Sequence, residues 1–164
     1  MKTKLVRSIM VPLVVACGLV SMVAATATGQ GTPGGILQGT WEMQLQRTNC
    51  AGTPLGPPAQ SVAIIMAGGT MMESQAPRPQ AQKTPGEGVW RLVAGNTFAF
   101  RFKYFTFDAT DPHVFTGWTI IAGEITVDAP GNTNTGHATI EVYNTSGALV
   151  ATACADVSGT RFGL

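Results

Sequence analysis

The chain has 164 residues, of which 45% are hydrophobic and only 12% are charged, and its formal net charge is +1 at pH 7. This length predicts one domain with a core of its own. A near-neutral chain without a basic stripe is not expected to bind nucleic acid, and it also lacks the basic face of a protein that lies on membrane surfaces.

The N-terminus has the three parts of a secretory signal peptide. Three basic residues within the first seven positions precede an apolar run at residues 9–23, and residues 25–27 read Ala-Thr-Ala, the small-x-small pattern of a cleavage site. The apolar run is shorter than the roughly 20 residues of a membrane-spanning helix. We therefore expect residues 1–27 to be removed and the remaining domain to be secreted or periplasmic rather than embedded in a membrane.

A second interpretation of this segment stays open. Residues 14–17 read Val-Val-Ala-Cys and are similar to a bacterial lipobox, in which Cys17 would be acylated and would anchor the protein. Against this interpretation, residues 18–27 are apolar, whereas the tether of a lipoprotein is normally polar.

Removal of residues 1–27 takes away three of the ten basic residues and none of the nine acidic ones, so the formal charge changes from +1 to −2. It also leaves two cysteines, Cys50 and Cys154. Two cysteines in an exported chain usually pair, and this bridge would stabilise the fold by up to ~4–5 kcal/mol because it closes a long loop. The alternative is two independent thiols.

Period-two alternation of apolar and polar residues dominates the rest of the chain, after a flexible leader at residues 28–36. The pattern predicts eight strands, joined mostly by short turns, at residues 39–47, 60–66, 70–74, 88–93, 97–107, 114–127, 137–144 and 149–156. The segment at residues 75–88 is polar and rich in proline, which indicates a long exposed loop.

Eight consecutive antiparallel strands favour a closed up-and-down β-barrel as the single domain at residues 37–164. Closure makes the first and last strands neighbours and removes both exposed edges. The cysteine positions agree, since Cys50 follows the first strand and Cys154 lies in the last. The alternative architecture is a two-sheet β-sandwich.

The start of the first strand, Gly39-Thr40-Trp41, resembles the G-x-W signature of the calycin barrels, which include the lipocalins, fatty-acid-binding proteins and avidins. This resemblance implies that an arginine near the chain end, here Arg161, packs across Trp41 and plugs one end of the barrel. The wider pattern over residues 37–163 is similar to that of small exported bacterial proteins of no settled function. It includes Gly86-Glu87-Gly88-Val89-Trp90 and the final Gly159-Thr160-Arg161-Phe162.

The fifth strand carries an aromatic face. Phe98, Phe100, Phe102 and Tyr104 alternate with smaller or charged residues, so they share one side of the strand. We expect this side to point inward, because four exposed aromatic residues in a row would promote aggregation. These rings either fill the core or line the wall of a cavity for an apolar or aromatic ligand. Flexible methionines would suit both roles, and the cavity-wall candidates among them are Met43 and Met66.

Motifs for catalysis or metal binding are missing from the sequence: it has no Gly-x-Ser-x-Gly elbow and no His-Glu-x-x-His. His113 and His137 stand at turns without a second ligand at metal spacing, and Asp108 and Asp111 are ordinary turn residues. We therefore predict neither a metal site nor a cofactor.

Three carboxylates are candidates for an inward acid–base group, and the sequence does not choose among them: Glu73, Glu124 and Glu141. The favoured function is a non-enzymatic exported barrel that binds a small apolar or aromatic ligand. One alternative is a barrel cyclase or isomerase acting on an apolar substrate, and another is a structural or interaction module with a filled core. The sequence leaves the oligomeric state undetermined.

Overall fold

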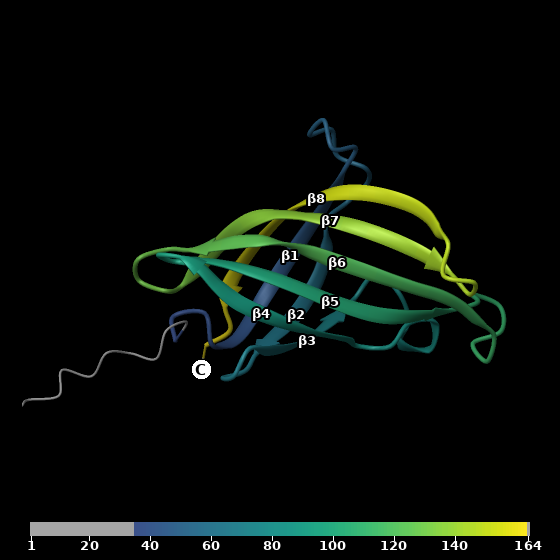
Figure 1. The fold of residues 1–164 in the computed structure, drawn as a ribbon, viewed down its shortest axis with the longest axis horizontal. Helices are drawn as coiled ribbons and strands as arrows, with labels where there is room; N and C mark the ends of the chain where they lie inside the picture. Colours follow the sequence, from purple (N-terminus) through teal and green to yellow (C-terminus); the bar gives the residue numbers. More distant parts are fainter. Residues whose placement is uncertain (1–34, 164) are drawn as a thin grey trace, which may run out of the picture. The chain divides into compact units, whose positions relative to one another are not determined.

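The computed structural model describes residues 35–163, most of which form eight antiparallel strands (Figure 1). The elements in chain order are β1 (Gly39–Thr48), β2 (Ala59–Ile65), β3 (Thr70–Gln75), the short 3-10 helix η1 (Gln80–Gln82), β4 (Gly86–Ala94), β5 (Thr97–Phe107), β6 (Phe115–Val127), β7 (Thr133–Asn144) and β8 (Leu149–Arg161). The predicted signal peptide, Cys17 and most of the predicted leader lie outside the described residues. Between residues 35 and 163, no helix is long and apolar enough to cross a membrane.

The strands form one closed barrel in the order β1 to β8, which confirms the predicted fold class and excludes the sandwich. Each strand pairs with its neighbours in sequence, and β1 also pairs with β8 over Trp41–Arg161 to Thr48–Cys154. In Figure 1 the dark blue β1 accordingly passes beside the yellow end of β8. Closure leaves neither of these two strands with a free edge.

Cys50 and Cys154 form a disulfide beside the β1–β8 pairing, as the sequence predicts. Their Cα atoms lie 4.8 Å apart although they are 104 residues apart in sequence. Cys154 is paired in register with Thr48, two residues before Cys50, so barrel closure itself brings the two cysteines together. The bridge therefore ties the end of β1 to β8 at one end of the barrel.

The inward faces of the strands form the hydrophobic core. On β5 the side chains of Phe98, Phe102 and Tyr104 are buried and Phe100 is half-buried, whereas Arg101 is exposed. Period-two alternation of this kind follows from strand geometry, which sends successive side chains to opposite faces. The predicted inward orientation of the aromatic face is therefore the one observed.

The largest extensions beyond the strand bounds that the sequence pattern indicates are those of β7 and β8. β7 begins at Thr133 rather than at residue 137, because the Asp128 carboxylate accepts hydrogen bonds from the amides of Asn132 and Thr133 and keeps the preceding turn short. β8 continues to Arg161 rather than ending at residue 156, because its last residues pair with both β7 and β1. Neither extension is apparent from the sequence, since residues 133–136 read Thr-Asn-Thr-Gly and residues 157–161 read Val-Ser-Gly-Thr-Arg, without an apolar–polar alternation.

The prediction of one exposed loop at residues 75–88 is wrong in part. Residues 76–81 are exposed, but Lys83 is fully buried, and β4 already begins at Gly86. An isolated bridge joins Lys83 to Thr106 at the end of β5, and the Thr84 amide donates to the Phe105 carbonyl oxygen. These contacts draw the end of the segment onto the barrel wall, so that its lysine side chain enters the interior.

Candidate functional site

One end of the barrel is closed by Arg161. Its guanidinium donates to three carbonyl oxygens, of Gly131 at 2.7 Å, Gln38 at 2.7 Å and Ile36 at 2.6 Å. Its Cζ atom lies 4.3 Å from the centre of the Trp41 ring, a cation–π distance. All three side-chain nitrogens of Arg161 are thereby hydrogen-bonded, and the residue covers Trp41 at the barrel end where the calycin resemblance implies a plug.

The same end requires a glycine. Gly39 has φ +125°, and a Cβ atom at this position would lie 2.6 Å from Nη1 of Arg161. Only glycine combines that backbone conformation with so close an approach. The Gly-x-Trp pattern at the start of β1 thus has a local physical reason, because its glycine leaves room for the arginine that covers the tryptophan.

The centre of the barrel is nearly filled. A chamber of about 50 Å³ remains there, and Met43, Phe100 and Phe102 are among the residues that line it. A water molecule takes up about 30 Å³ in the liquid, so the chamber has room for one or two waters and not for an organic ligand. Three of the predicted cavity-wall residues therefore meet at a space that is too small for the expected ligand.

Two other predicted cavity-wall residues lie elsewhere. Phe98 is completely buried and packs edge-to-face on Trp90, with ring centres 5.8 Å apart, so it belongs to the solid core. Met66 follows the last residue of β2 and is 37% exposed, because it has the same outward parity as the exposed Val62 and Ile64 of that strand. The sixth, Tyr104, lies nearer to the other end of the barrel.

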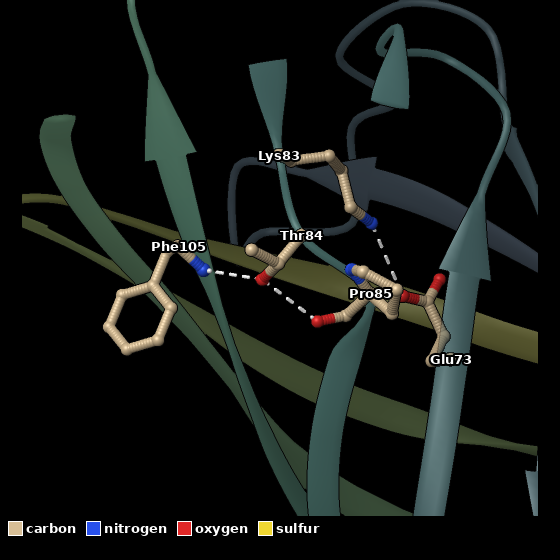
Figure 2. Close-up of polar contacts among 5 residues, drawn as sticks. All are labelled: Glu73, Lys83, Thr84, Pro85 and Phe105. Atoms are coloured by element: carbon tan, nitrogen blue, oxygen red, sulfur yellow. Dashed lines mark hydrogen bonds and ion pairs between the residues drawn. The ribbon is translucent and has the colours of Figure 1, made fainter. Parts of the chain in front are cut away.

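Beside the chamber lies a buried ion pair. Figure 2 shows the Lys83 ammonium directed at the Glu73 carboxylate of β3, with an Nζ–Oε2 distance of 3.4 Å. Lys83 is 0% exposed and Glu73 only 4%, and Nζ also lies 4.4 Å from the centre of the Tyr104 ring. Burial raises the pKa of the Glu73 carboxyl above its ordinary value, although the Lys83 charge opposes this shift.

Only one of the three candidate carboxylates points inward. Glu73 lies on the inner face of β3, whereas Glu124 is exposed and Glu141, on the outer face of β7, accepts a hydrogen bond from the Tyr143 hydroxyl at 2.9 Å. The sequence did not indicate Lys83 at all. Its segment has no alternating pattern, and its burial depends on a pairing with Thr106 on another strand.

The end opposite Arg161 opens into a pocket of about 210 Å³, which we call the mouth pocket. Its walls come from the inner faces of β1, β5, β6, β7 and β8 and include the apolar side chains of Leu45, Ile121, Ile140, Val142 and Ala153. Tyr104 and Thr119 provide hydroxyl groups among these walls. The disulfide lies at this same end, where it holds β1 against β8.

Two arginines, Arg47 and Arg78, line the mouth pocket, and both are exposed. Burial raises the pKa of the Tyr104 phenol above its ordinary value, and the Glu73 charge adds to this shift. A hydrogen bond with Thr119 and the two arginine charges oppose the shift without reversing it. The phenol is therefore neutral at physiological pH and can donate a hydrogen bond. Our sequence reasoning did not single out Arg47, although this residue continues the inward alternation of Trp41, Met43 and Leu45 on β1.

The histidines and the turn aspartates have local roles. Nδ1 of His137 lies 2.8 Å from Asp156 on the exposed outer surface. Asp108 accepts hydrogen bonds from the Thr110 amide and hydroxyl, which lowers the pKa of its carboxyl, and Asp111 accepts one from the His113 amide. In the part of the chain that the structure describes, no three His, Cys, Asp or Glu residues are grouped as ligands for a metal ion.

The chain was compared with models of known protein families and with curated proteins, and it matches none of them.

Proposed function

We propose that this protein is an exported barrel that binds a small, largely apolar ligand in the mouth pocket. The observation that carries the proposal is the distribution of space inside the barrel. The centre holds about 50 Å³, whereas the mouth pocket offers about 210 Å³ between aliphatic side chains and a smaller set of polar ones. Pockets for drug-sized ligands have about 300–1,000 Å³, so the ligand is smaller than these.

The N-terminal sequence and the disulfide support a location outside the cytoplasm. Residues 1–27 have the pattern of a signal peptide, and a disulfide persists in oxidising compartments such as the periplasm or the extracellular space. A ligand-binding barrel in such a compartment would take its ligand from the surrounding fluid through the open end.

The proposal can be tested with cinnamyl alcohol, a compact, neutral aromatic molecule. Titration of the ¹⁵N-labelled exported protein is expected to shift amide resonances around the mouth pocket, including those of Ile140, Val142 and Ala153. Ala153→Phe places a ring in the pocket and should weaken binding at least tenfold. Val150→Phe is the matched control, because Val150 is an exposed residue of the same strand that does not line the pocket.

Two results would contradict the proposal. One is an absence of shifts at the mouth pocket at millimolar concentrations of the alcohol. The other is an Ala153→Phe variant that folds normally and binds the alcohol as tightly as the wild-type protein does.

A second candidate function is supported by the ionisable groups near the pocket. The neutral Tyr104 phenol faces the pocket, and the Glu73–Lys83 pair lies behind it, an arrangement that could direct a proton to an apolar substrate as in a barrel cyclase or isomerase. Mass spectrometry of a ligand recovered from the protein separates the two functions. A binder returns the ligand unchanged, whereas an enzyme converts it and loses that conversion in Tyr104→Phe.

A further inference from the structure

We propose that the ligand of the mouth pocket is a compact organic anion, such as an aromatic or short-chain carboxylate, held by Arg47 and Arg78. This inference rests on the proposed function and adds the chemical class of the ligand. It starts from the charges that line the pocket. Both charged side chains of the lining are arginines, and the lining contains no aspartate or glutamate.

The two arginines come from different parts of the chain and meet at the same pocket. Arg47 lies near the end of β1, on the inward-facing side of that strand and two residues beyond the buried Leu45. Arg78 lies in the segment between β3 and η1. The fold therefore places at one pocket two positive charges that are 31 positions apart in the sequence. Like charges repel, so their common placement favours an anion between them.

Neither guanidinium has a partner of its own among residues 35–163. No hydrogen bond or ion pair in this range involves the side chain of Arg47 or Arg78, whereas Arg161 makes three hydrogen bonds to backbone oxygens. A guanidinium offers five N–H donors in a planar fork that matches a carboxylate. The donors at the mouth pocket are thus available to a ligand, whereas those of Arg161 are already occupied.

The remaining walls set the form of the ligand. Tyr104 adds a neutral O–H donor, and its phenol is close enough to both arginines to be influenced by their charges. The aliphatic side chains of Ile121, Ile140 and Val142 leave an apolar space for a ring or a short chain. The volume of about 210 Å³ equals that of about seven water molecules, which suits an acid of the size of cinnamate and not a long fatty acid.

The experiment compares three probes of one shape: trans-cinnamate, the neutral cinnamamide and the cationic cinnamylamine. Isothermal titration at low salt is expected to give at least tenfold tighter binding for cinnamate than for cinnamamide, and the weakest binding for cinnamylamine. Raising the NaCl concentration to 0.5 M should reduce the preference for cinnamate several-fold, because the arginines are exposed and salt screens their charge.

Substitution of the two arginines tests whether they hold the carboxylate of the ligand. Arg47→Gln and Arg78→Gln should each reduce cinnamate affinity, and the double variant should bind cinnamate and cinnamamide equally well. Arg101→Gln is the matched control, since Arg101 is an exposed arginine of β5 that does not line the pocket. Its affinity for cinnamate should equal that of the wild-type protein.

Three results would overturn the inference. If cinnamamide binds to the wild-type protein as tightly as cinnamate, the pocket binds apolar ligands without a charge preference, and the proposed function stands alone. If the double variant keeps the preference for cinnamate, other groups hold the anion. If neither probe binds, the proposed function falls together with the inference.

Discussion

The two ends of the barrel both carry arginine side chains, and their surroundings differ. At one end Arg161 donates to three backbone oxygens and covers the Trp41 ring. At the other end Arg47 and Arg78 line an open pocket, and within residues 35–163 they have no hydrogen-bonded or ionic partner. An arginine with all its nitrogens bound contributes to the stability of the fold, whereas one without a partner is available for binding.

Between the two ends, Lys83 represents a third arrangement. It is fully buried, and its charge is balanced by Glu73 rather than by carbonyl oxygens or by solvent. A buried ion pair of this kind costs desolvation energy and is strongly destabilising when one partner is removed. We therefore expect substitution of the basic residue to have a different effect in each of the three environments.

The largest effect is expected at the closed end. Arg161→Met should lower the free energy of unfolding by about 3–4 kcal/mol, because three charge-assisted hydrogen bonds are lost and their carbonyl oxygens keep no donor. Arg47→Met at the open end should change it by less than about 0.5 kcal/mol, as for most surface substitutions. Urea denaturation of both variants measures the difference. Equal losses of stability would contradict the comparison.

A smaller, pH-dependent effect is expected at Lys83. Lys83→Met should cost about 3 kcal/mol at pH 8, because it leaves the ionised Glu73 carboxylate buried and unpaired. The cost should be smaller at pH 5. The pKa of Glu73 is raised in the folded state, so its contribution to stability is fully present below the unfolded pKa and is lost as the pH rises through the folded pKa.

Urea denaturation at pH 5 and pH 8 checks this prediction for Lys83. The double variant Lys83→Met with Glu73→Leu is the control, since it removes both charges and should recover most of the stability lost at pH 8. A loss that is the same at both pH values would show that Glu73 does not become an unpaired charge in the single variant.

The smallest effect concerns the open end when ligand is present. At a cinnamate concentration ten times its Kd, the wild-type protein should gain about 1.4 kcal/mol of stability from binding. The double variant Arg47→Gln with Arg78→Gln should gain much less at the same concentration, while its stability without ligand stays close to that of the wild-type protein. Thermal unfolding with and without cinnamate measures both. An equal gain in the two proteins would remove the distinction between the ends.

The fold could be predicted from the sequence because its signals are local. Alternation at Phe98, Phe100, Phe102 and Tyr104 identified both the strand and its inward face. The expectation that Cys50 and Cys154 would pair added the one long-range constraint that closure requires, and the structure contains that bridge. Alternation follows from strand geometry and is visible in a short stretch of sequence. The cysteine pairing follows from the oxidising environment of an exported protein and needs only the count of cysteines.

The candidate site was less predictable because it depends on contacts between distant segments. Lys83 is buried because its segment pairs with the end of β5. Arg78 lines the mouth pocket although its segment has no alternating pattern that would place it there. Met66 was a candidate for the cavity wall, but it follows β2 in step with the outward-facing Val62 and Ile64. Alternation indicates which side chains face inward, but not that aromatic side chains fill the centre of the barrel and leave the larger space at its open end.

The most direct test of the account is to locate cinnamate in the complex by NMR. The protein is labelled with ¹³C at the methyl groups of Ala, Ile and Val, and intermolecular NOEs to the ligand ring are measured. We expect NOEs to methyl groups of the mouth pocket, namely those of Ile140, Val142 and Ala153. NOEs to Ile65 or Ile125, which line the central chamber instead, would place the ligand inside the barrel and contradict the account.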